Sequence, residues 1–587
     1  MTGLMIGCLC IFATASAKPA AIELGGALGA RFDLTIRENI LKLDVEKDFL
    51  APFVARQEKA GRFIGLGKLA DALVHFARNS PDPSVRALKE KVIAFIVAHQ
   101  LADGYTGCLE PGKRMRALWD THEMGFVLQA LVADAELFGN RAALEAARRN
   151  ADYVVSRWSQ QPSAAEREVV CDMVRHIGLG YGLLRLAAVT ADRRTLDFVR
   201  REGVCANWDG SIVLGRGRGV RGHAYAHLSA CLEQLELNRL EPDDGLKAAS
   251  RRILGFMTEG DGLLVDGAGG ICECWTDDQD GAGDVGETCM VAYLLMFCRE
   301  LLEQGIGDES RLGDLIERTV YNALFAAQSG SGRQLRYYTP LNGVRKYWKG
   351  DLYCCPNNFR RAMSRLPELV FRQRGDTIGV DLYTACRASF AVNGKSVAIH
   401  EETDYPSTGR VKIVVEPASD VAFTLAVRVP GWCSRPSVRV CGADVACEPG
   451  SRLCLSRTWT RGDTVELDFP MTIRTVFGRK RQAGRIAVLR GPVVQALDTR
   501  AIPGLKDVHP LDAEAMLTLD PSSLTEDGGV VCATVKVRGA TRKVRLAPFA
   551  DENGTLTYFR VPAIQACGAV DDELLTSGCV RRRKSER

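Results

Sequence analysis

Four residues in two short motifs form a set that suits a zinc ion. Glu287 and Cys289 lie in GETC, at the start of an apolar helical pattern, and Cys354 and Cys355 follow a loop rich in Gly and Lys. The opening turn of a helix would let Glu287 and Cys289 reach the same ion. One carboxylate oxygen and three sulfur atoms make a four-coordinate set that zinc accepts. The motifs therefore predict a zinc site.

Three other interpretations of these cysteines stay open. Cysteine is a small residue that is often buried, so Cys289, Cys354 and Cys355 could simply fill a core. A zinc ion closed by four protein ligands could also be purely structural. The loop GGICECWTDDQDG adds a C-x-C pair, Cys272 and Cys274, which could supply ligands instead.

A zinc-bound thiol is deprotonated, so such a site would hold a nucleophile without a separate base. A hydrolase that used this thiolate would also need a proton donor for the leaving group. Glu273 is the nearest carboxyl candidate upstream of the ligand helix. Its competitors in the same loop are Asp277, Asp278, Asp280 and Asp284.

Three of the eight histidines stand at or near the starts of predicted helices. They are His122 in WDTHEMG, His176 in VRHIGLG and His223 in RGHAYAH. A single histidine in such a place is more often a helix-end residue without a further role. Helix starts that converge on one mouth of a toroid, however, would place the imidazoles around one pocket, where they could bond sugar hydroxyls.

The elements that must position these residues change type near residue 375. From about residue 49 to 371, apolar residues recur at helical spacing, and short Gly, Asp or Pro breaks separate about ten to twelve helices. Paired helices of this kind predict an α/α toroid, assigned to residues 30–374. The apolar period then changes to 2, as in GRVKIVVEP and AFTLAVRVPGW, which predicts β-sandwich modules over residues 375–500 and 501–587.

Composition excludes several classes of partner. The 76 basic residues nearly balance 72 acidic ones, for a formal net charge of +4. The net charge therefore produces no overall electrostatic field that would attract nucleic acid or an acidic membrane. The basic cluster at residues 581–584 is interpreted as a solvated C-terminal tail. After the N-terminus no apolar run reaches the ~20 residues of a membrane-spanning helix. The expected partner is a neutral small molecule or glycan.

The first 17 residues resemble a signal peptide. An apolar run from Leu4 to Ala13 precedes Ala15-Ser16-Ala17, which fits the small-residue rule for cleavage. This stretch lacks the Lys or Arg of a usual signal, so a buried N-terminal segment or a misassigned start is the alternative. We expect a secreted or periplasmic protein.

The order of the motifs resembles the β-L-arabinofuranosidase group of glycoside hydrolases, family 127 and its close relatives. In chain order the motifs are DGY at Asp103, WDTHEMG, VRHIGLGYGLLRLAAVTADRR, RGHAYA, the acidic loop after GGICE, GETC, IERTVYNALFAAQ, YYTPLN, CCPNN, RVPGW and RIAVLRGPVV. The resemblance extends from about residue 30 to 500. It implies an (α/α)6 barrel followed by β-sandwiches, with a zinc ion held by one Glu and three Cys.

The resemblance also implies a role for each residue and a reaction. Cys354, one of the four ligands, would be the nucleophile and Glu273 the acid/base. The sugar-binding residues would be His122, His176, His223, Glu317 and Tyr337. The implied reaction is hydrolysis, with retention, of a terminal β-L-arabinofuranoside on a plant-type glycan. Two rival functions remain: another toroid enzyme, such as a lyase or a two-carboxylate hydrolase, and a glycan-binding protein with a structural zinc.

Overall fold

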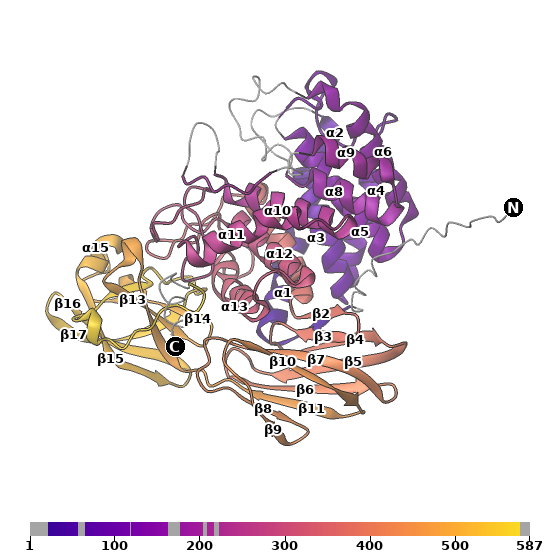
Figure 1. The fold of residues 1–587 in the computed structure, drawn as a ribbon. Helices are drawn as coiled ribbons and strands as arrows, with labels where there is room; N and C mark the ends of the chain where they lie inside the picture. The colour runs from indigo at the N-terminus through magenta and orange to yellow at the C-terminus, as the bar shows by residue number, and fades with distance from the viewer. Residues whose placement is uncertain are drawn as a thin grey trace.

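The computed structural model describes residues 21–56, 65–117, 119–161, 177–203, 208–215 and 222–575. The expected signal segment at residues 1–17, His176 and the basic cluster at residues 581–584 lie outside these residues. A helical domain is followed along the chain by two β-rich domains, which lie below and beside it in Figure 1. Across the described ranges, no helix has the length and apolar character needed to span a membrane.

A closed ring of helices forms the centre of the helical domain. In the described part of the chain its members are α3 (Leu66–Asn79), α5 (Asp120–Phe138), α8 (Leu179–Thr190), α10 (Ala224–Leu240), α12 (Thr288–Gln304) and α14 (Cys354–Ser364). Each helix packs against the next, and α14 packs against α3. Almost every residue of α3 and α10 is buried, as expected for helices enclosed on all sides.

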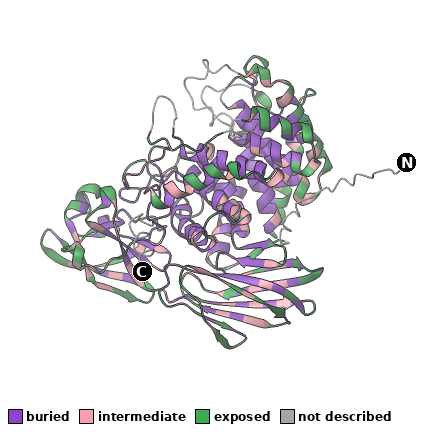
Figure 2. Ribbon diagram, in the orientation of Figure 1, coloured by how far each residue is buried: buried purple, intermediate pink, exposed green. Residues whose placement is uncertain are grey.

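A second layer of helices surrounds this ring. It contains α1 (Gly26–Glu38), α4 (Pro83–His99), α6 (Arg141–Ser156), α9 (Arg193–Glu202), α11 (Ala248–Glu259) and α13 (Glu309–Thr319). In Figure 2 the helices at the edge of the domain are buried on one side and exposed on the other. Asp82, Asn140, Asp192 and Asp308 cap α4, α6, α9 and α13 by accepting backbone N–H groups. The two layers confirm the predicted toroid.

The first β domain is a sandwich of two sheets. The larger sheet has the order β1 (Glu23–Leu24), β4 (Cys386–Val392), β5 (Lys395–Thr403), β6 (Arg410–Pro417), β11 (Asp463–Asp468), β8 (Ser437–Val440), β9 (Ala443–Val445). The smaller has the order β10 (Ser451–Trp459), β7 (Val421–Val429), β3 (Thr377–Val380), β2 (Phe371–Arg374). In β6 every second residue is buried, which is the period-2 pattern of its sequence.

The second β domain is a single sheet that closes on itself. Its order is β12 (Ile473–Phe477), β13 (Arg485–Arg490), β14 (Val493–Ala496), β17 (Ala540–Pro548), β16 (Val530–Val537), β15 (Leu517–Asp527), β18 (Tyr558–Arg560). Strand β18 also pairs with β13, and the short helix α15 (Pro510–Ala515) packs on β15 and β18. The predicted boundary at residue 500 is therefore wrong, because β12, β13 and β14 belong to this later sheet. Period-2 alternation continues through both domains and does not show which sheet a strand joins.

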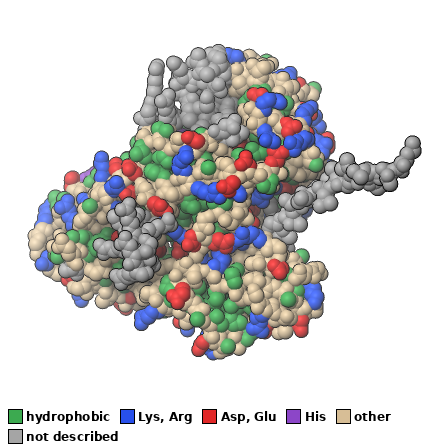
Figure 3. Space-filling view, viewed as in Figure 1, with side chains coloured by type: hydrophobic (Ala, Val, Ile, Leu, Met, Phe, Trp, Pro, Cys, Tyr) green, Lys and Arg blue, Asp and Glu red, His purple; other side chains and the backbone are tan. Residues whose placement is uncertain are grey.

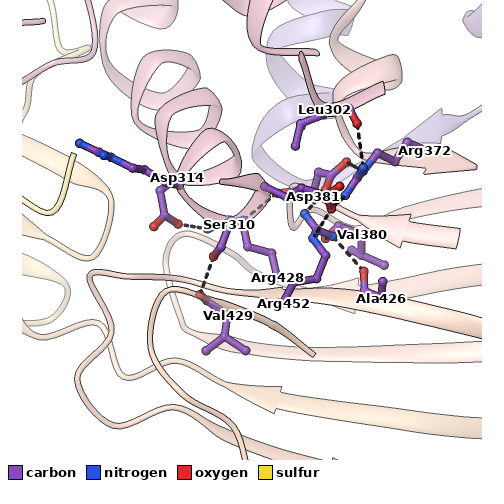
Figure 4. Close-up of polar contacts among 12 residues, drawn as sticks. Leu302, Ser310, Asp314, Arg372, Val380, Asp381, Ala426, Arg428, Val429 and Arg452 are labelled. Atoms are coloured by element: carbon purple, nitrogen blue, oxygen red, sulfur yellow. Dashed lines mark hydrogen bonds and ion pairs between the residues drawn. The ribbon is translucent and has the colours of Figure 1, made fainter. Parts of the chain in front are cut away.

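Buried charges connect the helical domain to the first β domain, as Figure 4 shows. Arg372 donates from Nη1 to the carbonyl of Leu302 at 3.0 Å and from Nε to Asp381 at 3.0 Å. Ser310 of α13 donates to the carbonyl of Val429 in β7 at 3.2 Å. Such pairing holds the orientation of the two domains, because an unpaired buried charge is very costly. On the face shown in Figure 3, basic and acidic side chains are interspersed, in line with the near-neutral net charge.

Candidate metal centre and active site

The first turns of the ring helices supply the side chains of the site. Lys68 lies in the first turn of α3, His122 in that of α5, and His223 directly precedes α10. Glu287 directly precedes α12, and Cys354 is the first residue of α14. The carboxylate of Glu123 joins two of these turns by accepting the backbone N–H groups of Gly65 and Gly67. Helix N-termini favour negative charge, which suits a cluster of thiolates and carboxylates.

Glu287, Cys289, Cys354 and Cys355 come together at this mouth. One ligand atom from each lies within 4.8 Å of the others. The Sγ atoms of Cys289 and Cys355 are 3.2 Å apart, and Sγ of Cys355 lies 3.6 Å from Oε1 of Glu287. Within the described ranges this group includes neither Cys272 nor Cys274, so the alternative ligand set with the C-x-C pair is not assembled.

The carboxylate of Glu287 shows that the cluster fits a cation. Its side chain is buried, and among the described residues its Oε2 has no hydrogen-bond partner. Burial, together with the negative charges of Cys354 and Glu273, raises the pKa of Glu287 well above its usual range. A buried carboxylate needs a proton, a partner or a metal. One carboxylate beside three sulfurs is a donor set for a thiophilic divalent ion.

Cys354 differs from the other two cysteines of the cluster. Hydrogen bonds from Cys289 and Cys355, together with the nearby ammonium of Lys68, hold the pKa of Cys354 well below that of an ordinary thiol. Burial instead raises the pKa of both Cys289 and Cys355. Cys354 is also partly exposed, whereas the other two are buried. A low pKa and access from solvent are the properties of a reactive thiolate.

Glu273 is presented at the tip of a tight turn. Ile271 and Cys274 exchange backbone hydrogen bonds of 2.9 and 3.0 Å, and the central residues Cys272 and Glu273 have φ of 48° and 69°. Positive φ at both central positions defines a hairpin turn that normally uses Asn or Gly. Side chains other than Gly or Asn are strained there by roughly 1–3 kcal/mol, a feature that clusters at functional sites.

The hydroxyl of Tyr337 connects Glu273 to the cysteine cluster. It donates a hydrogen bond of 2.5 Å to Oε1 of Glu273 and lies 3.6 Å from Sγ of Cys354. Of the competing aspartates, Asp278 and Asp280 instead pair with Arg481 of the second β domain, each at 3.2 Å. The structure therefore brings Glu273, Tyr337 and Cys354 together.

His122 and His223 lie at the mouth of the ring, as their positions at helix starts indicated. His122 is 1% exposed, and its ring packs edge-on against Trp119 and Phe126. Burial and the nearby charges of Lys68 and Arg361 hold the pKa of His122 well below 6.5, so this imidazole is neutral at neutral pH. His223 is buried beside Tyr225, with ring centroids 5.5 Å apart. Sugar binding by these two residues stays a prediction.

Glu317 lies at the domain junction and not at this mouth. Its Oε1 accepts hydrogen bonds from Tyr405 at 2.6 Å and Arg428 at 2.5 Å, and its Oε2 accepts one from Trp432 at 2.9 Å. The side chain is fully buried between α13 and the first β domain. Both oxygens are thus occupied, which contradicts the predicted contact with sugar. The motif IERTVYN does not reveal that α13 belongs to the outer layer and turns this carboxylate towards the β domain.

Two contributors to the site escaped the motif reasoning. Asn358 donates a hydrogen bond of 3.1 Å from Nδ2 to Sγ of Cys289, and its Oδ1 accepts one of 3.3 Å from Arg361. Lys68 is fully buried, with its ammonium 4.6 Å from the ring centroid of Phe126. A lysine inside an apolar helix, and an Asn four positions after Cys354, were the available signals.

Comparison with known proteins identifies the family. The model of the β-L-arabinofuranosidase GH127 catalytic domain matches residues 48–368, and that of the GH127 middle domain matches residues 377–471. A non-reducing end β-L-arabinofuranosidase of Bifidobacterium longum is 24% identical over 495 residues, which cover 72% of this chain and 73% of that protein.

Two solved structures share the fold. A GH127 β-L-arabinofuranosidase from Geobacillus stearothermophilus T6 has a TM-score of 0.76 at 21% identity, with 92% of this chain and 100% of that one covered. A second GH127 β-arabinofuranosidase has a TM-score of 0.77 at 19% identity, with 95% and 99% covered. Because the catalytic-domain model alone matches more than half of the chain, the protein belongs to the GH127 β-L-arabinofuranosidase family and is a glycosidase.

Proposed function

We propose that this protein hydrolyses terminal β-L-arabinofuranosides with retention of configuration, with Cys354 as nucleophile and Glu273 as acid/base. The observation that carries the proposal is the bridge made by Tyr337. Its distances of 2.5 Å to Glu273 Oε1 and 3.6 Å to Cys354 Sγ limit the separation of those two atoms to about 6 Å. Retaining glycosidases place their two groups ~5–5.5 Å apart, whereas inverting enzymes leave ~6.5–9.5 Å for a water molecule.

In the first step the thiolate of Cys354 attacks the anomeric carbon. A carbon–sulfur bond forms as the bond to the leaving oxygen breaks, and the carboxylic acid of Glu273 gives its proton to that oxygen. In the second step the Glu273 carboxylate takes a proton from water, and the water oxygen attacks the same carbon. The carbon–sulfur bond breaks, the thiolate is restored, and two displacements leave the configuration unchanged.

Glu287, Cys289, Cys354 and Cys355 would hold a zinc ion, which when bound keeps the thiols deprotonated and makes the thiolate a better leaving group. The chain supports this chemistry with its own charges. Tyr337 orients Glu273 through their hydrogen bond, and the ammonium of Lys68 lies close enough to Cys354 and Cys289 to lower the pKa of Cys354. Asn358 holds the sulfur of Cys289 in place.

The names of the relatives support an arabinofuranoside as the sugar. The neutral imidazole of His122, together with His223, would donate and accept hydrogen bonds with the furanose hydroxyls. Since plant-type glycans lie outside the cell, we also propose export through the segment at residues 1–17.

Hydrolysis of a panel of aryl furanosides and pyranosides tests the proposal, with the anomer first released identified by proton NMR. We expect activity on the β-L-arabinofuranoside, one zinc ion per chain, and a β-configured first product. Cys354→Ser should abolish turnover, whereas the control Cys298→Ser, which changes a buried cysteine of α12 that lies outside the cluster, should remain active. An inverted product, or undiminished activity of Cys354→Ser, would overturn the mechanism.

A further inference from the structure

A cleft of about 610 Å³ opens beside the pair Glu273 and Tyr337. Tyr337 lines this cleft and also contacts both Glu273 and Cys354, so the cleft begins next to the reactive groups. A volume of this size is in the range of ~300–1,000 Å³ that holds drug-sized ligands. It is much larger than a small leaving group such as methanol would need.

Aromatic side chains line the inner wall of the cleft. Tyr337, Tyr338, Tyr347, Trp348 and Tyr353 all belong to this wall, and all are partly exposed. Trp348 and Tyr353 stack with their ring centroids 5.1 Å apart and their planes at 23°, and Trp348 lies 5.4 Å from Tyr337. The indole N–H of Trp348 donates to the carbonyl of Leu352 at 3.0 Å, which fixes this platform.

The second β domain supplies another part of the cleft wall. His509 and Leu511, at the start of α15, line the same cleft as Val344. Leu511 is 41% exposed and Val344 47% exposed, so two large apolar side chains face solvent here. Glu514 anchors α15 by accepting hydrogen bonds from Arg485 and, at 3.4 Å, from Asn342. The wall is therefore held in position relative to the aromatic platform.

We propose that this cleft binds the leaving group of the substrate as a chain of two or more sugar rings. The inference rests on the proposed function, because Glu273 would protonate the leaving oxygen and the group attached to that oxygen must extend past Tyr337. Sugar rings present C–H faces with a small positive partial charge, which pack on the negative faces of aromatic rings. Three polar residues that line the cleft, Asp284, Lys346 and His509, can bond the hydroxyls.

The test compares substrates that share a terminal β-L-arabinofuranosyl unit and differ in the leaving group, namely methanol, one sugar or three sugars. We expect kcat/KM to rise with each added ring. In the variants Trp348→Ala and Leu511→Asp, the ratio of kcat/KM for the longest substrate to that for the methyl glycoside should fall about fivefold or more. Val530→Asp, which changes an exposed apolar residue on β16 of the same domain, is the control and should keep the wild-type ratio.

Two results separate this inference from the proposed function. The leaving-group site alone would be overturned if the protein hydrolysed the methyl or aryl glycoside but kcat/KM did not depend on the length of the leaving group. It would also be overturned if Leu511→Asp and the wild type had the same ratio of kcat/KM for the longest substrate to kcat/KM for the methyl glycoside. If the wild-type protein hydrolysed none of these substrates, the proposed function would be overturned. In that case calorimetric titration with the free trisaccharide tests the leaving-group site by itself. The inference requires that the trisaccharide bind more weakly to zinc-loaded Leu511→Asp than to zinc-loaded Val530→Asp, and equal affinities would overturn it.

Discussion

Replacing Asn358 by Ala removes a hydrogen bond that the protein donates to a sulfur of the cluster formed by Glu287 and the three cysteines. Nδ2 of Asn358 lies 3.1 Å from Sγ of Cys289, and Arg361 holds the amide by donating to its Oδ1 at 3.3 Å. Arg361 is itself fixed by a 2.6 Å bond to Asp71. A hydrogen bond to a charged group contributes about 1.5–3 kcal/mol. Mutation of a residue that hydrogen-bonds to a metal ligand typically lowers metal affinity by ~10–100-fold.

We therefore expect Asn358→Ala to bind zinc at least about tenfold more weakly than the wild type. Competition with a chromophoric chelator measures this affinity. Substitution with Co²⁺ adds a second readout, because the thiolate-to-metal absorption should shift when the bond to Cys289 is lost. Thermal unfolding of the metal-free proteins reports separately on the stability of the fold.

The neighbouring Asn357 provides a matched control. It is equally buried and lies on the same helix, but its Oδ1 accepts a hydrogen bond from Arg360 at 2.8 Å and not from Arg361. Asn357→Ala should lose stability without a comparable loss of zinc affinity. Equal zinc affinities for the two variants, or an unchanged Co²⁺ spectrum in Asn358→Ala, would refute this reasoning.

Three further predictions follow from other contacts. Tyr337→Phe should lower kcat/KM by about 10–150-fold, because it removes a charge-assisted bond to Glu273, whereas Tyr338→Phe serves as its control. Glu317→Ala should destabilise the protein by about 3–5 kcal/mol in urea unfolding, since it leaves Arg428 without one buried partner, while zinc content stays at the wild-type level. Burial, with a smaller effect of His223, lowers the pKa of His227 to about 4, so between pH 6.5 and 4 the unfolded chain takes up a proton that the folded chain does not. When the pH falls from 7 to 4, the free energy of unfolding should therefore drop by about 3 kcal/mol more in the wild type than in His227→Gln. Equal drops in the two proteins would contradict the low pKa of His227.

Periodicity was sufficient to predict the architecture but not the second domain boundary. The helical period reflects burial of apolar faces, which both layers of the toroid require, and period 2 reflects the two faces of a strand. Neither period says which strands hydrogen-bond together. Strands β12 to β14 therefore looked like a continuation of the first sandwich, although they pair within the closing sheet.

Motif spacing placed the four cluster residues correctly because each pair lies at the start of its own helix. GETC and CCPNN both occupy first turns, and helix starts converge on one mouth of a toroid. Glu317 was expected at the site from the resemblance alone, and its helix α13 belongs to the outer layer. Contacts between residues far apart in sequence, such as Tyr337 with Glu273, depend on loop paths that spacing does not encode.

A covalent sugar adduct on Cys354 is the most direct test of the central claim. An aryl β-L-arabinofuranoside has a good leaving group, so in Glu273→Gln the first displacement should proceed while the second, which needs a base, becomes slow. Rapid acid quench, proteolysis and mass spectrometry should then reveal one pentosyl group on the peptide that contains Cys354, in step with a burst of released phenol. A burst without this adduct, or an adduct on another residue, would contradict the assignment of Cys354 as the nucleophile.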